Sequence, residues 1–137
     1  MPVLAAVAAL CAAAPAQAAA PNYILVSGPG IRHPILLGDW NENLQLLGAL
    51  VTAPIAKGDA VRNLGRRTRF DLAEFWGWGT RPRPTRPSQA NQHGWLYPAH
   101  ASKPAVIVLM VNGSRAPRLL PQHVREIFLR HHVPLRR

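Results

Sequence analysis

Two different spacings of apolar residues run along this chain, and they predict its secondary structure. Residues 23–26 form an apolar run typical of a strand, and residues 31–37 form its return strand after a turn at residues 27–30. The turn contains Pro29 followed by Gly30, the pair that the two central positions of a type II turn favour. Pro34 has no backbone N–H to donate to a neighbouring strand, so the return strand is expected at an edge of the sheet.

A helical spacing follows the first two strands. Asp39 and Glu42 stand three positions apart directly before an apolar run, as in a capping box that begins a helix. Leucines and a valine then recur at intervals of three and four residues, and Pro54 predicts that the helix ends at about Thr52.

The second half of the chain predicts three strands and a helix. Aromatic and alternating residues favour a strand at 70–78, although Asp71 and Glu74 would also suit one helix turn. A short strand is predicted at 94–97. Residues 105–111 are apolar at every position and rich in β-branched residues, so this strand is expected at the centre of the sheet. The last helix is predicted to begin at Pro121 and to be closed by Pro134. Its apolar stripe consists of Val124, Ile127 and Phe128.

This order of elements, β-β-α-β-β-β-α, predicts an α+β fold. We expect a mostly antiparallel sheet of about five strands with both helices packed on one face. The apolar stripes of the helices need a sheet to cover them, which favours this fold over an all-β sandwich. At 137 residues, 48% of them apolar, the chain suits one small domain and is too apolar for a wholly disordered protein.

The first 20 residues resemble a signal peptide. They are apolar, carry no charge and end in alanine-rich positions that a signal peptidase accepts, although a basic start is missing. We therefore predict a signal peptide at 1–20 and a single α+β domain at 21–137. Cleavage would remove Cys11, the only cysteine, and with it any disulfide, thiolate metal site or cysteine nucleophile. A membrane anchor is the alternative, but alanine and proline make the run too weakly apolar.

Charge is the strongest functional signal. The chain has a net charge of +10, and no acidic residue occurs between Phe75 and Arg125. A basic Pro/Arg loop at 79–92 lies in this stretch, so an anionic partner is one interpretation, and genome composition favouring arginine is the other. The predicted anion-binding residues are Arg81, Arg83 and Arg86, with Trp76, Trp78 and Trp95 as an aromatic platform beside them.

Catalytic motifs are absent from the sequence. No serine stands in a nucleophile motif, the Gly-Pro-Gly turn does not lead into a helix as a phosphate loop does, and the histidines lack zinc-site spacing. We therefore predict no metal and no cofactor. The enzyme alternative is a small hydrolase with His93 or His100 as the base and Asp71 or Glu74 as its carboxylate. A salt bridge between Arg69 and Asp71 is the structural interpretation of the same region.

The sequence thus predicts a non-catalytic, exported domain that binds an anionic or protein partner at the bacterial cell envelope. The opening residues 23–30 and the later residues 94–98 are similar to segments of small exported bacterial proteins. Export disfavours nucleic acid and leaves an anionic envelope polymer, a lipid surface or another exported protein as partners. We expect a monomer. A hydrolase and a purely structural or inhibitor-like secreted domain are the alternatives.

Overall fold

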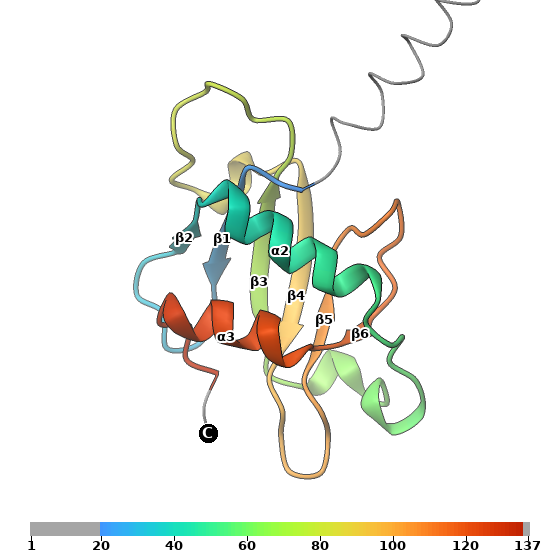
Figure 1. Ribbon diagram of the computed structural model, residues 1–137. Helices are drawn as coiled ribbons and strands as arrows, with labels where there is room; N and C mark the ends of the chain where they lie inside the picture. The colour runs from blue at the N-terminus through green and yellow to red at the C-terminus, as the bar shows by residue number, and fades with distance from the viewer. Residues whose placement is uncertain (1–19, 136–137) are drawn as a thin grey trace, which may run out of the picture.

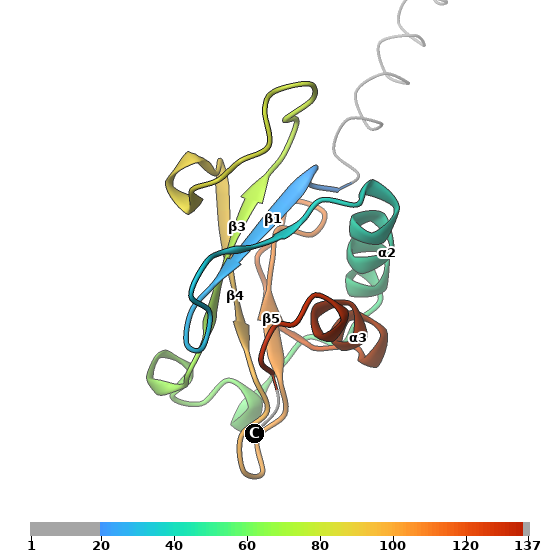
Figure 2. The same ribbon diagram turned by 90° about the vertical axis from the view of Figure 1, so that its left-hand side faces the viewer.

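A computed structural model describes residues 20–135 and shows a six-stranded antiparallel sheet with helices on one face (Figures 1 and 2). The strand order in space is β2-β1-β3-β4-β5-β6. The strands are β1 (Tyr23–Ser27), β2 (Ile35–Leu37), β3 (Phe70–Phe75), β4 (Gln92–Tyr97), β5 (Val106–Val108) and β6 (Arg118–Leu119); the helices are α2 (Trp40–Val51) and α3 (Gln122–Arg130). The predicted α+β fold, with its antiparallel sheet, is confirmed. The predicted signal peptide, including Cys11, falls almost wholly on residues outside the described range.

The additional strand is β6, which contains only two residues and therefore has no periodicity of its own. It forms because the segment after α2 makes backbone hydrogen bonds with it. Ala56 N donates to Pro117 O, and Leu119 N donates to Pro54 O, each at 2.9 Å. The Arg118 guanidinium also donates to Leu50 O at 3.1 Å, at the end of α2 where a positive charge favours the helix dipole.

The turn after β1 has the predicted type II geometry. Ile31 N donates to Gly28 O at 3.1 Å, and Gly30 has a φ of +80°, the left-handed conformation that glycine adopts readily. The return strand is shorter than predicted and begins only at Ile35. It does lie at the edge of the sheet, as the proline at position 34 indicated.

Helix α2 begins as the capping pattern predicted. Asp39 is the N-cap, and its carboxylate accepts from Glu42 N at 3.0 Å. The Glu42 side chain, however, does not complete a capping box. It accepts from Arg130 Nη2 at 3.0 Å and contacts His131 Nε2 at 2.5 Å, which joins the start of α2 to the end of α3.

Helix α3 is shorter than predicted at both ends. Pro121 is the N-cap and not the first helical residue. The helix stops at Arg130 because His132 is left-handed, with a φ of +66°, and Val133 N turns back to donate to Phe128 O at 3.1 Å. This is the hydrogen bond of a Schellman C-cap, so the helix ends before Pro134 is reached.

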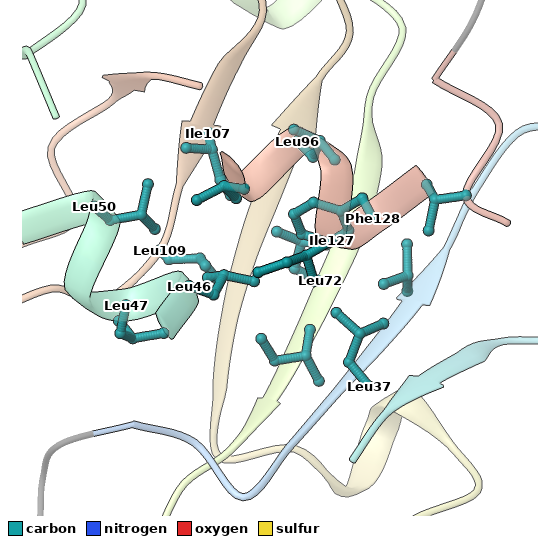
Figure 3. Close-up of a cluster of buried hydrophobic side chains, with 14 of the residues drawn as sticks. Leu37, Leu46, Leu47, Leu50, Leu72, Leu96, Ile107, Leu109, Ile127 and Phe128 are labelled. Atoms are coloured by element: carbon teal, nitrogen blue, oxygen red, sulfur yellow. The ribbon is translucent and has the colours of Figure 1, made fainter. Parts of the chain in front are cut away.

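The main core lies between the two helices and the sheet (Figure 3). The predicted stripe of α3 is fully buried there. Alternate residues of the strands point toward the helices, as a period of two requires. Labelled members of this core in Figure 3 are Leu37, Leu46, Leu47, Leu50, Leu72, Leu96, Ile107, Leu109, Ile127 and Phe128.

The opposite face of the sheet is covered at its two ends by loops (Figure 2). Residues 56–66 include the short 3-10 turns η2 (Gly58–Ala60) and η3 (Leu64–Arg66), and apolar side chains of this segment pack against Tyr97, Val106 and Val108. This covering explains why β5 is apolar on both faces although it is not central. The expectation that it lies at the centre was wrong: β3 and β4 are the middle strands of the sheet.

Within residues 20–135, none of the helices combines the length and the apolar character needed to cross a membrane.

Candidate functional site

The predicted basic loop connects β3 to β4 at one end of the sheet (Figure 1). We call residues 76–91 the arginine loop. It contains one short 3-10 turn, η4 (Pro87–Gln89), and otherwise no regular structure. Arg81, Arg83 and Arg86 are all exposed on it.

Trp78 anchors the first half of the arginine loop. Its ring meets Phe75 edge to face, with centroids 4.9 Å apart and planes at 81°. Its backbone N donates to Asn22 Oδ1 at 2.7 Å, and its indole Nε1 donates to Pro82 O at 2.8 Å. The loop is therefore tied both to the sheet and to the segment that precedes β1.

The second half of the arginine loop is held by two amide side chains. Asn91 accepts from Trp76 N at 3.0 Å and donates to Trp76 O at 2.8 Å, which closes the base of the loop. Gln89 Oε1 accepts from Arg86 N at 3.2 Å and Thr85 N at 3.3 Å. The sequence carries no signal for these two residues, since an amide side chain in a polar loop is also typical of a solvated surface.

The guanidinium groups of the loop have no acidic partner. In the part of the chain that the structure describes, no carboxylate lies within 4.0 Å of Arg81, Arg83 or Arg86. Arg81 lies over the Trp78 ring, with its Cζ 4.9 Å from the ring centroid, in a cation–π arrangement. The three arginines of the loop therefore present positive charge that no neighbouring carboxylate neutralises.

The three tryptophans proposed as one platform are separated. Trp76 packs against the core beneath the helices, whereas Trp78 packs on the other face of the sheet. Trp95 lies in β4 and packs with Tyr97, Val106 and Val108. Arg69 Cζ lies 5.1 Å from its ring centroid. Trp78 is therefore the one that directly adjoins a predicted anion-binding arginine.

The carboxylates of Asp71 and Glu74 cannot pair, because residues three apart in a strand face opposite sides of the sheet. Asp71 is exposed and forms the expected salt bridge, with its Oδ1 3.6 Å from Arg69 Nε. Glu74 is fully buried. A two-carboxylate site built from these residues is therefore excluded.

Glu74 is a buried carboxyl with an incomplete set of partners. Trp76 Nε1 donates to its Oε1 at 2.9 Å, while its Oε2 is buried without a hydrogen-bond partner. Burial raises the pKa of Glu74, and the hydrogen bond from Trp76 and the nearby Arg115 charge offset only part of this effect. Arg115 is held in place by the side chain of Gln92 and the backbone oxygen of His93.

Glu74→Gln is expected to become more stable, relative to the wild type, as the pH rises. A raised pKa means that the folded state binds the proton more tightly than the unfolded state does. The wild-type protein therefore loses stability as the pH rises above 4.5, the ordinary pKa of a glutamate. As the pH rises above about 4.5, the variant should gain stability relative to the wild type in urea unfolding, because only the wild type then buries a carboxylate charge.

Asp71→Asn is the matched control for this titration. It removes the Asp71 carboxylate, which lies on the same strand but is exposed and contacts Arg69. Because no buried charge is removed, this variant should not gain stability relative to the wild type as the pH rises. A Glu74→Gln difference that stays constant with pH would show that burial does not perturb this carboxyl.

The histidines proposed as bases are not placed beside an acid. His93 is exposed in β4, and His100 is exposed in a loop where its backbone pairs with Lys103. Among residues 20–135, the histidine within 4.0 Å of a carboxylate is His131, beside Glu42. No group of three histidine, cysteine, aspartate or glutamate side chains that could hold a metal ion occurs in the same range.

Comparison with models of known protein families, with curated proteins and with solved structures gave no match to this chain.

Proposed function

We propose that this protein is a non-catalytic, exported domain that binds an anionic partner at the bacterial cell envelope through the arginine loop. One observation carries the proposal: three exposed arginines stand without a carboxylate counter-ion on a loop that side-chain hydrogen bonds hold in place. A surface of this kind suits phosphate or carboxylate groups, which the planar guanidinium binds with two parallel hydrogen bonds.

The rigidity of the loop supports binding over simple solvation. A mobile loop loses conformational entropy when it binds, and this loss weakens the affinity. The contacts of Trp78, Gln89 and Asn91 order the loop before any partner arrives. The charged groups can then engage a partner with a smaller entropic cost.

Replacement of all three loop arginines by glutamine is expected to weaken binding to vesicles that contain phosphatidylglycerol. Each basic residue near an anionic surface contributes about 1 kcal/mol, so the loss should reach roughly a hundredfold at low salt. Cosedimentation with mixed phosphatidylglycerol and phosphatidylcholine vesicles, and with purified cell-wall fragments, measures the affinity of the purified protein. High salt should weaken wild-type binding in either assay.

A control variant with the same net charge separates a site from general attraction. Arg32, Arg62 and Arg125 lie outside the arginine loop, and their joint replacement by glutamine should lower the affinity by less than about fivefold. If both triple variants lose affinity equally, or if the wild type binds neither material, the arginine loop is not the contact.

A further inference from the structure

A cavity lies among the segments at the end of the sheet opposite the arginine loop. Figure 1 shows these segments at the bottom of the view and the arginine loop at the top. The turn after β1, the residues that lead into β3, the loop after β4 and the C-terminal segment surround a cavity of about 560 Å³. This volume lies within the range of small-molecule sites, roughly 300–1,000 Å³. The predicted turn contributes Pro29 and Gly30 to its lining and His100 also lines it, whereas no residue of the arginine loop does.

The walls of the cavity are mostly rigid and apolar. Pro29, Phe70, Pro98 and Pro134 come from four separate segments and contribute ring side chains to the lining. The turn brings two of these segments together: a Cβ placed at Gly30 would lie 3.3 Å from Pro134 Cγ. Proline rings lack a backbone donor and cannot rotate about φ, so these walls keep their shape when empty.

Two arginines line the cavity, and they have different roles. The Arg67 guanidinium is already occupied by hydrogen bonds within the protein. Its Nη1 donates to Ala60 O at 3.1 Å, and its Nη2 donates to Pro98 O at 2.7 Å and to Pro104 O at 2.9 Å. Arg66 is exposed, and within the described residues no carboxylate lies within 4.0 Å of it. Arg66 is therefore the cation available to a ligand.

The polar part of the lining favours an anion. His100 and Thr68 contribute to it beside Arg66, and no aspartate or glutamate does. We propose that this cavity binds a small organic carboxylate with an apolar ring body. The body packs against the proline rings and Phe70, and the carboxylate faces the Arg66 guanidinium. This site is independent of the arginine loop.

Three probes that share one ring system test this charge preference. Naphthoate, naphthylmethanol and naphthylmethylammonium differ in the charge of the group on the ring, and calorimetric titration gives the affinity of the purified protein for each. Naphthoate should bind about tenfold more tightly than the alcohol, because a charge-assisted hydrogen bond is stronger than a neutral one. The ammonium should bind more weakly than the alcohol. Equal affinity for all three would overturn the proposal.

Two variants locate the binding in the cavity. Ala99→Trp places a large side chain at an exposed position of the lining and should lower naphthoate affinity by more than about tenfold. Arg66→Gln should lower it about fivefold, while Arg86→Gln, which removes the same charge from the arginine loop, should change it by less than about twofold. Equal losses in the two glutamine variants would show attraction by net charge alone, and unaltered binding by folded Ala99→Trp would place the probe elsewhere.

Discussion

Gly94→Ala is expected to lower the free energy of unfolding by about 3 kcal/mol or more, because overpacking against backbone leaves no low-energy adjustment. A Cβ at this position would lie 2.1 Å from Val108 O and 2.9 Å from Leu109 Cδ2. The carbonyl belongs to the strand next to β4, where Trp95 pairs with Val108. Moving it away would break the sheet hydrogen bonds that join β4 to β5. Urea unfolding followed by tryptophan fluorescence measures the change.

Gly48→Ala is the matched control and should change stability in the opposite direction. Gly48 lies on the exposed side of α2, and a Cβ there would have no neighbour within 4 Å. Alanine is the better helix former by about 1 kcal/mol, so this variant should be more stable by roughly 0.5–1 kcal/mol. If Gly94→Ala retained stability within about 1 kcal/mol of wild type, the close approach of β5 to Gly94 would be wrong.

The sequence predicted those parts of the fold that depend on neighbours along the chain. The type II turn with Pro29 and Gly30 at its centre, the N-cap at Asp39 and the apolar stripe of α3 each follow from a few consecutive residues, and each is confirmed. The two-residue strand β6 was missed because its formation depends on residues 54–56, which hold it from more than 60 positions away.

Local rules failed where a distant partner competes for a side chain. Glu42 stands at the third position of a capping box, but its carboxylate binds Arg130 and His131 at the end of α3. An ion pair with a guanidinium outcompetes a hydrogen bond to one backbone amide. Neither partner could be found by spacing, since both lie almost 90 residues further along the chain.

The three tryptophans do not form the predicted aromatic platform, because the backbone conformation at Gly77 separates Trp76 from Trp78. Trp76 and Trp78 would share one face if the strand continued through them. The strand ends at Phe75, and Gly77 has a φ of +61°, a left-handed conformation that turns the chain and sends the two rings to opposite faces of the sheet. The sequence contains the glycine but does not specify its conformation. The cavity beside Arg66 was likewise invisible, because its lining comes from four segments that only the fold brings together.

Asn43→Asp is expected to lower the free energy of unfolding by about 3 kcal/mol or more near pH 7, because it buries a charge without a partner. Asn43 lies in α2 and is fully buried, and its Nδ2 donates to Pro21 O and Asn22 O at 3.2 Å and to Leu37 O at 3.3 Å. These bonds attach the segment before β1 and the end of β2 to the helix. The variant keeps the side-chain shape but replaces the donor by an oxygen that repels the carbonyls.

The charge on the variant side chain makes this prediction dependent on pH, and a neighbouring position isolates the cause. Protonation restores one donor and removes the buried charge, so the deficit of Asn43→Asp in urea unfolding should shrink as the pH falls toward about 4. Asn41 is exposed in the first turn of the same helix, where a negative charge favours the dipole. Asn41→Asp should therefore be neutral or stabilising by a few tenths of a kcal/mol. A similar stability of the two variants near neutral pH would mean that the Asn43 side chain does not hold the strands to the helix.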